Sequence, residues 1–130
     1  MVCLDTDILI GLLQGDQNAI DAIRRLQDEG EPLKTTAINA YELLKGAQVS
    51  SRQNENLNNI TELLANIPVL PLNQEPCEEA SKIYGKLRRD GHTIGEFDIL
   101  IASITIVQGE PLITRDGHFQ LIKDLNLQTW

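Results

Sequence analysis

The segment VCLDTDILI, residues 2–10, places two carboxylates between two apolar runs. A carboxylate in apolar surroundings is costly unless hydrogen-bond donors or a cation compensate its charge. The first run, Val2–Leu4, predicts a short buried strand, and the second begins a helix that we expect from about Ile8 to Gln14. Asp5 would therefore lie where a strand opens into a helix, which is where α/β sheets collect their active groups.

The same alternation of short apolar runs and longer helical patterns continues along the chain. Further strands are expected at residues 32–36, 68–72, 112–114 and 127–129, and further helices at 17–28, 38–47, 52–66, 75–89 and 98–107. The last helix is ambiguous, because its β-branched residues favour a strand while its length, closed by Gly109, favours a helix buried on most sides; we expect the helix. Strands separated by helices predict an α/β fold, with one domain over residues 1–130 and a short, mostly parallel sheet of four to five strands flanked by helices.

The composition is typical of a globular protein, with 42% apolar and 23% charged residues. A formal net charge of −8 argues against an obvious electrostatic nucleic-acid binder, but it is compatible with an enzyme whose acidic centre holds cations. No apolar run approaches the roughly 18 residues of a membrane span, and Asp5 and Asp7 interrupt any signal-peptide pattern. We therefore expect a cytoplasmic protein without a membrane partner.

The cysteines and histidines do not form a metal-binding pattern. The two cysteines, Cys3 and Cys77, lack a CxxC or Cys/His spacing, so neither a disulfide nor a structural zinc site is expected. Cys3 is interpreted as a buried core thiol. The two histidines, His92 and His118, stand alone in polar loops and are interpreted as surface residues.

Carboxylates on several different segments are expected to meet at one edge of the sheet. Asp5 and Asp116 follow the first and fourth strands, at ends that a parallel sheet brings together. Asp98 opens the buried helix, and Glu42 lies on the helix after the second strand. Clustered carboxylates repel one another, and hard divalent cations such as Mg²⁺ and Mn²⁺ relieve that repulsion by taking oxygen ligands. A cluster without histidine or cysteine therefore suggests phosphate chemistry rather than zinc hydrolysis.

Each carboxylate also has an ordinary structural explanation. Asp5 or Asp7 could cap the following helix, and Asp7 suits that role better because it directly precedes the apolar run that begins the helix. Glu42 could be a solvated helix residue, and Asp98 could complement a helix dipole. Asp116 could belong to an ordinary turn with the glycine that follows it. The case for a site depends on their combined placement.

Four segments, taken in order, resemble the PIN domain and, within it, the VapC-type toxins of prokaryotic toxin–antitoxin pairs. They are LDTDILI at residues 4–10, YELLKG at 41–46, IGEFDILIA at 94–102 and LITRD at 112–116, and their order, spacing and total length fit over essentially the whole chain. The resemblance implies a PIN-like nuclease domain and a metal-dependent endoribonuclease that acts as the toxin of a VapBC-type pair. It also implies a VapB-like antitoxin partner and a homodimer.

By position in these motifs, the resemblance implies a set of catalytic, metal-binding carboxylates for Mg²⁺ or Mn²⁺, namely Asp5, Glu42, Asp98 and Asp116. Thr6 and Thr114 occupy positions where the family favours a small hydroxyl residue that supports the site. Glu96 could be a further outer ligand or a solvated loop residue. Asp7 departs from the usual Asn or Ser, which leaves open whether it caps the helix or adds charge to the cluster.

The basic residues nearest the motifs, Lys45 and Arg115, are expected to contact RNA phosphates. The basic run at residues 86–89 is better explained as a solvated helix end. Aromatic residues make up only 4% of the chain, so extensive base stacking is not expected and a structured or narrow RNA target is predicted.

Two other functions remain open at the level of the sequence. The same fold could hold a metal without catalysing a reaction, as a non-catalytic PIN-fold binding module. Asp5 and Asp7 also satisfy the DxD part of a haloacid-dehalogenase-like phosphatase signature, but Leu9 stands where that signature has Thr or Val.

Overall fold

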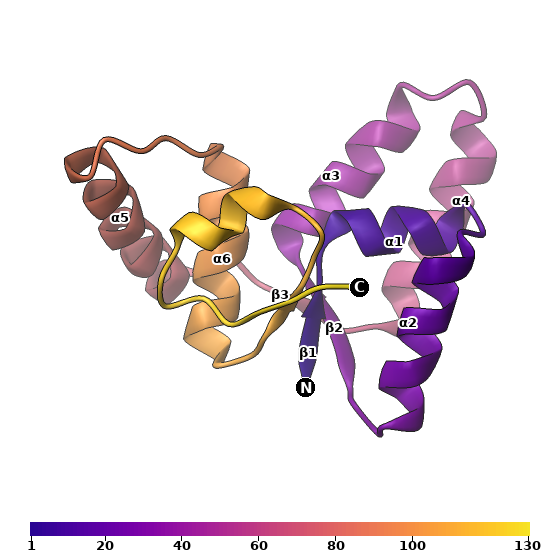
Figure 1. Ribbon diagram of the computed structural model, residues 1–130. Coiled ribbons are helices and arrows are strands. Elements are labelled where there is room, and N and C mark those ends of the chain that lie inside the picture. Colours follow the sequence, from indigo (N-terminus) through magenta and orange to yellow (C-terminus); the bar gives the residue numbers. More distant parts are fainter.

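A parallel sheet of five strands forms the centre of the molecule in the computed structural model, which describes residues 1–130 (Figure 1). In the order in which they lie side by side, the strands are β3 (Val69–Leu70), β2 (Leu33–Thr36), β1 (Val2–Leu4), β4 (Leu112–Ile113) and β5 (Leu127–Gln128). The chain runs outward from β1 to β3 and then returns to the other side of β1 with β4, so the strand order reverses beside β1. In open α/β sheets, ligands bind at such a reversal, outside the carboxyl ends of the strands.

Helices cover both faces of this sheet. They are α1 (Thr6–Leu13), α2 (Gln17–Asp28), α3 (Ala37–Gln48), α4 (Gln53–Asn66), α5 (Gln74–Arg89) and α6 (Glu96–Gln108), with a short 3₁₀ turn, η1 (Gly117–Leu121). In Figure 1, α5 and α6 lie on one side of the sheet and α1 to α4 on the other. Val2 and Leu4 of β1 pack into the core on the α1–α4 side, whereas Cys3 packs into the core on the α5–α6 side. Because β1 is buried on both faces, all its side chains are apolar.

The expected α/β architecture is confirmed, including the helix that the β-branched residues of 98–107 made ambiguous. That segment forms most of α6, whose side chains are buried along much of its length. Cys3 is a free, fully buried thiol, as expected. None of the helices combines the length and apolar character needed to cross a lipid bilayer.

The start of α1 differs from the prediction. The helix begins at Thr6 rather than Ile8, so Asp7 lies within its first turn and does not cap it. The N-cap position belongs to Asp5, whose backbone is extended (φ −74°, ψ 166°) and whose side chain makes no capping hydrogen bond. The backbone N–H of Asp5 donates to the carbonyl of Ile113 at 3.1 Å, which continues the pairing of β1 with β4. The strand therefore holds Asp5 extended, and the helix can start only at the next residue.

Candidate active site

Asp5 is the most deeply buried carboxylate at the carboxyl edge of the sheet, with 6% of its surface exposed. Its Oδ1 accepts a hydrogen bond from Asn39 Nδ2 at 2.9 Å, and its Oδ2 accepts one from Thr114 Oγ1 at 2.6 Å. Burial raises the pKa of Asp5 to about 6, while these hydrogen bonds oppose the rise by stabilising the charged form. The carboxylate is therefore held in one orientation by donors from two other segments.

Asn39 is a component of the site that sequence reasoning missed. It is fully buried on α3, where it forms a capping box with Thr36. The backbone N–H of Asn39 donates to Thr36 Oγ1 at 3.2 Å, and the Asn39 side-chain oxygen accepts from Thr36. Its Nδ2 group is left to donate toward Asp5. The one signal in the sequence is the spacing of a Thr followed three residues later by an amide, which is a variant of the capping-box pattern.

Thr6 links this network to Glu42. The Thr6 hydroxyl accepts from Asn39 Nδ2 at 2.9 Å and donates to Glu42 Oε1 at 2.8 Å. Glu42 is half-buried on α3, one turn beyond Asn39. The predicted supporting position of Thr6 therefore corresponds to a direct hydrogen bond with one of the predicted site carboxylates.

Asp7 joins α1 to the segment that follows β4. Its Oδ2 accepts from the backbone N–H of Arg115 at 2.7 Å and lies 3.2 Å from Thr114 Oγ1, and its Oδ1 accepts from Trp130 Nε1 at 3.2 Å. Arg115 in turn donates through Nε to the carbonyl of Trp130 at 2.7 Å, and its guanidinium lies 3.5 Å from the centre of the indole ring. The charge of Asp7 contributes to the raised pKa of Asp5, but its oxygens are occupied by these structural contacts.

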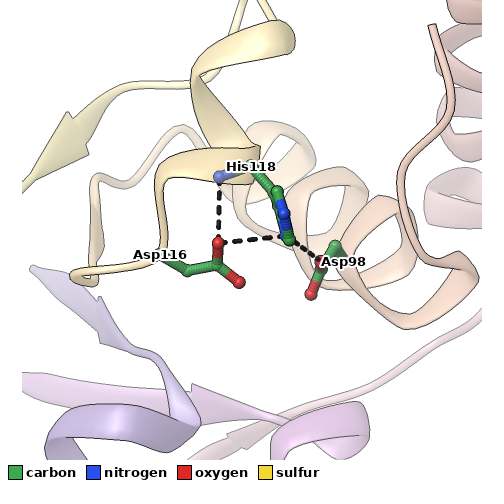
Figure 2. Close-up of side chains that lie close together, drawn as sticks. All are labelled: Asp98, Asp116 and His118. Carbon is green, nitrogen blue, oxygen red and sulfur yellow. Dashed lines mark hydrogen bonds and ion pairs between the residues drawn. The ribbon is translucent and has the colours of Figure 1, made fainter.

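The remaining two predicted carboxylates come from the first turn of α6 and from the start of η1. Asp98 lies in the first turn of α6, and Asp116 caps η1 by accepting from the backbone N–H of His118 at 2.9 Å. Figure 2 shows the three side chains converging, with His118 Nδ1 3.2 Å from Asp116 Oδ1 and 3.9 Å from Asp98 Oδ2. Burial raises the pKa of Asp98, and the charges of Asp116 and Glu42 raise it further, whereas His118 opposes the rise.

The prediction that His118 stands alone is therefore wrong, although its side chain is 73% exposed as a surface histidine would be. No pattern in the sequence predicted the short η1 turn, which brings His118 back to Asp116. One ligand atom from each of Asp98, Asp116 and His118 lies within 4.8 Å of the others. Ligand atoms that share a cation at about 2.0–2.6 Å lie no further apart than about 4–5 Å, so this donor set fits a single divalent ion.

The other predicted residues lie at the margin of the cluster. Glu96 is exposed at the start of α6 and lines a cavity of about 340 Å³ against α5, without a hydrogen bond to the carboxylates. Lys45 is exposed on α3, with its Nζ over the rings of Tyr41 and Phe97. Asp5 and Glu42 thus share one hydrogen-bond network, and Asp98 and Asp116 form a second group with His118, whereas Glu96 belongs to neither.

A cavity of about 270 Å³ begins at Glu42 and extends between α1, α3 and α4. Its lining is partly apolar and includes Ile10, Leu13 and Ile60. Ile10 is 40% exposed, which is unusual for a large apolar side chain. An apolar surface therefore leads directly to the acidic cluster.

The model of the PIN domain family matches residues 2–125 of the chain. Among curated relatives, Ribonuclease VapC1 of Haemophilus influenzae strain R2866 is 31% identical over 129 residues, covering 98% of this chain and 96% of the relative. Ribonuclease VapC10 of Mycobacterium tuberculosis strain H37Rv is 29% identical over 126 residues, covering 96% of this chain and 90% of the relative.

Solved structures show the same fold. The structure of VapBC-1 from nontypeable Haemophilus influenzae contains a chain that superposes with a TM-score of 0.87 at 30% identity, covering 100% of this chain and 98% of that chain. The structure of VapBC2 from Rickettsia felis bound to a promoter DNA fragment contains one with a TM-score of 0.90 at 22% identity, covering 100% of this chain and 99% of that chain.

Proposed function

The chain belongs to the PIN domain family, and from this premise we propose that it is a divalent-metal-dependent endoribonuclease, the toxin of a VapBC-type toxin–antitoxin pair. The observation that carries the proposal is the position of the acidic residues directly after β1, on α3, in the first turn of α6 and at the start of η1, beside the reversal of the strand order. The relatives at about 30% identity are named ribonucleases, and a structural neighbour at similar identity is a toxin–antitoxin complex.

The carboxylates that would hold one or two Mg²⁺ or Mn²⁺ ions are Asp5, Glu42, Asp98 and Asp116. A divalent ion bound there supplies positive charge for the phosphodiester oxygens and lowers the pKa of water. The protein contributes the orientation of the ligands: Asn39 and Thr114 fix Asp5, and Thr6 fixes Glu42. Such hydrogen bonds to metal-ligating groups set their geometry and basicity.

The acidic character of the chain is compatible with an RNA substrate. Removing four site carboxylates from the formal charge of −8 leaves −8 + 4 = −4, and bound divalent ions offset the charge of the site itself. Lys45 lies one helical turn after Glu42 on α3 and is proposed to contact RNA phosphates. Arg115 keeps this proposed role through its terminal nitrogens, because the observed hydrogen bond to Trp130 uses only its Nε.

For the protein partners, we propose that a VapB-like antitoxin places an apolar segment in the cavity that extends from Glu42. Its apolar lining and the exposed Ile10 support such an occupant. A homodimer and a cytoplasmic location complete the proposal by analogy with the family.

The DxD phosphatase alternative has no support in the geometry. The second acid of such a pair would have to remain free for proton transfer, and the Asp7 oxygens instead accept hydrogen bonds from Arg115 and Trp130. A non-catalytic PIN-fold module would bind the metal but cleave no RNA. An RNA cleavage assay therefore distinguishes it from the proposed endoribonuclease.

The test is cleavage of RNA by the purified chain, with Mg²⁺, with Mn²⁺ and with excess EDTA. Cleavage is expected only with a divalent ion, and Asp5→Asn and Asp98→Asn should each abolish it. Asp28→Asn, at the exposed end of α2, is the matched control and should cleave normally. Cleavage that persists in EDTA or in both site variants would contradict the proposal.

A further inference from the structure

Two aromatic rings and one lysine form a cluster at the rim of the candidate site. Tyr41 and Lys45 lie one helical turn apart on α3, and Phe97 lies in the first turn of α6. The ring centroids of Tyr41 and Phe97 are 5.6 Å apart with their planes at 88°, which is an edge-to-face pair. Lys45 Nζ lies 5.3 Å from the Tyr41 centroid and 5.2 Å from the Phe97 centroid. We call Tyr41, Lys45 and Phe97 the rim cluster.

The rim cluster borders the acidic centre from two helices. Tyr41 directly precedes Glu42 on α3, and Phe97 directly precedes Asp98 on α6. The contact between the two rings joins α3 to α6 one residue before each of these carboxylates. The rings therefore lie next to the place where α3 and α6 bring their carboxylates together.

The exposure of Tyr41 and Lys45 is not explained by the packing of the chain, whereas Phe97 is half-buried. Tyr41 is 51% exposed, although it is a large aromatic residue in contact with another ring. Lys45 is exposed and forms no ion pair, in a chain that has 19 acidic residues and 11 lysines and arginines. A free ammonium group is thus held against two aromatic side chains beside a concentration of negative charge.

We propose that the rim cluster is a platform on which an unpaired base of the RNA substrate stacks, next to the phosphate that is cleaved, while Lys45 contacts the RNA backbone. This inference rests on the proposed ribonuclease function. Aromatic faces bind bases of any sequence by stacking, and lysine is a common partner of backbone phosphates. Because the contact of the two rings joins α3 to α6 one residue before each site carboxylate, the stacked base belongs to a nucleotide near the scissile bond.

The platform defines a class of substrate. A base inside an RNA duplex has both faces covered by its neighbours, whereas bases in loops, bulges and single strands can turn outward and stack on protein side chains. Cleavage is therefore directed to unpaired nucleotides. An RNA strand matches the rim cluster better than an apolar protein segment does, because the cluster presents a free cation together with the rings.

The test compares binding of two fluorescein-labelled RNAs by fluorescence anisotropy. One is a random-sequence pool of single strands about 12 nucleotides long, within the usual range of site sizes, and the other is a blunt duplex of the same length. Every protein carries Asp116→Asn to suppress cleavage. The variants are Tyr41→Ala, Tyr41→Phe and, as a matched control, Tyr84→Ala. Tyr84 is 43% exposed on α5 and also pairs with a cation, Arg88, at 5.9 Å.

Tyr41→Ala is expected to weaken binding of the single strands by about 5- to 100-fold, as the loss of one stacked base does elsewhere. Tyr41→Phe keeps the ring and should bind as the parent does, and so should Tyr84→Ala. Duplex binding should be the same in all of them. Unchanged single-strand binding by Tyr41→Ala, or an equal loss on the duplex, overturns the platform.

A cleavage assay without the Asp116 substitution separates this inference from the function on which it rests. If the wild-type chain cleaves RNA and Tyr41→Ala has a lower kcat/KM with cuts confined to unpaired nucleotides, both proposals are supported. If wild type and Tyr41→Ala cleave with equal kcat/KM, the platform is overturned and the ribonuclease function stands. A wild-type chain that cleaves no RNA with Mg²⁺ or Mn²⁺ overturns the proposed function itself.

Discussion

Replacing the buried carboxylate of Asp5 by an amide is expected to stabilise the metal-free protein while it abolishes cleavage. Burial raises the pKa of Asp5 to about 6, against an ordinary value of about 3.9. At about 1.36 kcal/mol per pH unit, keeping this group charged at neutral pH costs the folded state about 3 kcal/mol. The amide of Asp5→Asn avoids that cost and keeps the hydrogen-bond network. Its oxygen can accept from Asn39, and its NH₂ can donate to Thr114, whose hydroxyl can turn to Asp7 Oδ2 at 3.2 Å.

The assay is urea unfolding of wild type and Asp5→Asn in EDTA from pH 8 to pH 4. Because the folded-state pKa lies above the unfolded value, the folded protein takes up a proton between about pH 6 and pH 4 that the unfolded chain does not. The variant should therefore be more stable by about 1–3 kcal/mol above pH 6, and its advantage should shrink as the pH falls toward about 4. Mn²⁺ should stabilise the wild type more than the variant. A variant that is less stable than wild type at pH 8 in EDTA would refute this account of the site.

Three further substitutions test other contacts of the site and its scaffold. Asn39→Ala removes the donor to buried Asp5, so we expect a loss of about 2–4 kcal/mol in urea unfolding together with loss of cleavage; a loss below about 1 kcal/mol would be inconsistent with the network. His118→Ala should lower Mn²⁺ affinity about 10-fold in calorimetric titration while stability stays within about 0.5 kcal/mol, since the side chain is 73% exposed; equal affinity would show that His118 does not contribute to metal binding. Gly11→Ala should destabilise by about 1–3 kcal/mol despite the helix propensity of alanine, because the new Cβ would lie 2.8 Å from Ala19 Cβ; a rise in the thermal midpoint would show that α1 and α2 separate freely.

The placement of the acidic residues was predictable because it follows from local patterns and one rule of topology. Asp5 and Asp116 come directly after short apolar runs, and a parallel sheet brings such positions to a common edge. The helix at residues 98–107 was also predictable, since a strand of that length followed at once by another strand would be unusual. Asp98 at its start then had to lie near the same edge.

The hydrogen-bond partners of these carboxylates were not predictable from the sequence. Asn39 reaches Asp5 only because α3 packs against α1, whose N-cap is Asp5, and the local capping pattern gives no information about that packing. Asp7 was wrongly predicted to cap α1. The position of the N-cap depends on where the extended backbone of β1 ends, and pairing with β4 keeps the backbone extended as far as Asp5. His118 depends on a single 3₁₀ turn, which has no hydrophobic period to detect.

The expectation about aromatic residues shows the limit of composition. A low aromatic content argued against extensive stacking, but a count of rings does not say where they lie. Tyr41 and Phe97 are far apart in the sequence and adjacent in space, because α3 and α6 pack together beside the carboxylates. Composition limits how many such rings there are, and tertiary packing decides whether they serve one site.

The hydrogen bond between Thr114 and Asp5 joins residues 109 positions apart, and this distance bears on when the protein can become harmful to the cell that makes it. Contacts of such long range form late, because closing the intervening chain costs entropy before the contact repays it. A growing chain of fewer than 98 residues carries Asp5 and Glu42 but neither Asp98 nor β4, so its acidic centre is incomplete. If the proposed activity holds, such a chain is harmless to the RNA of the ribosome that is producing it, and an antitoxin is needed only once β4 has paired with β1.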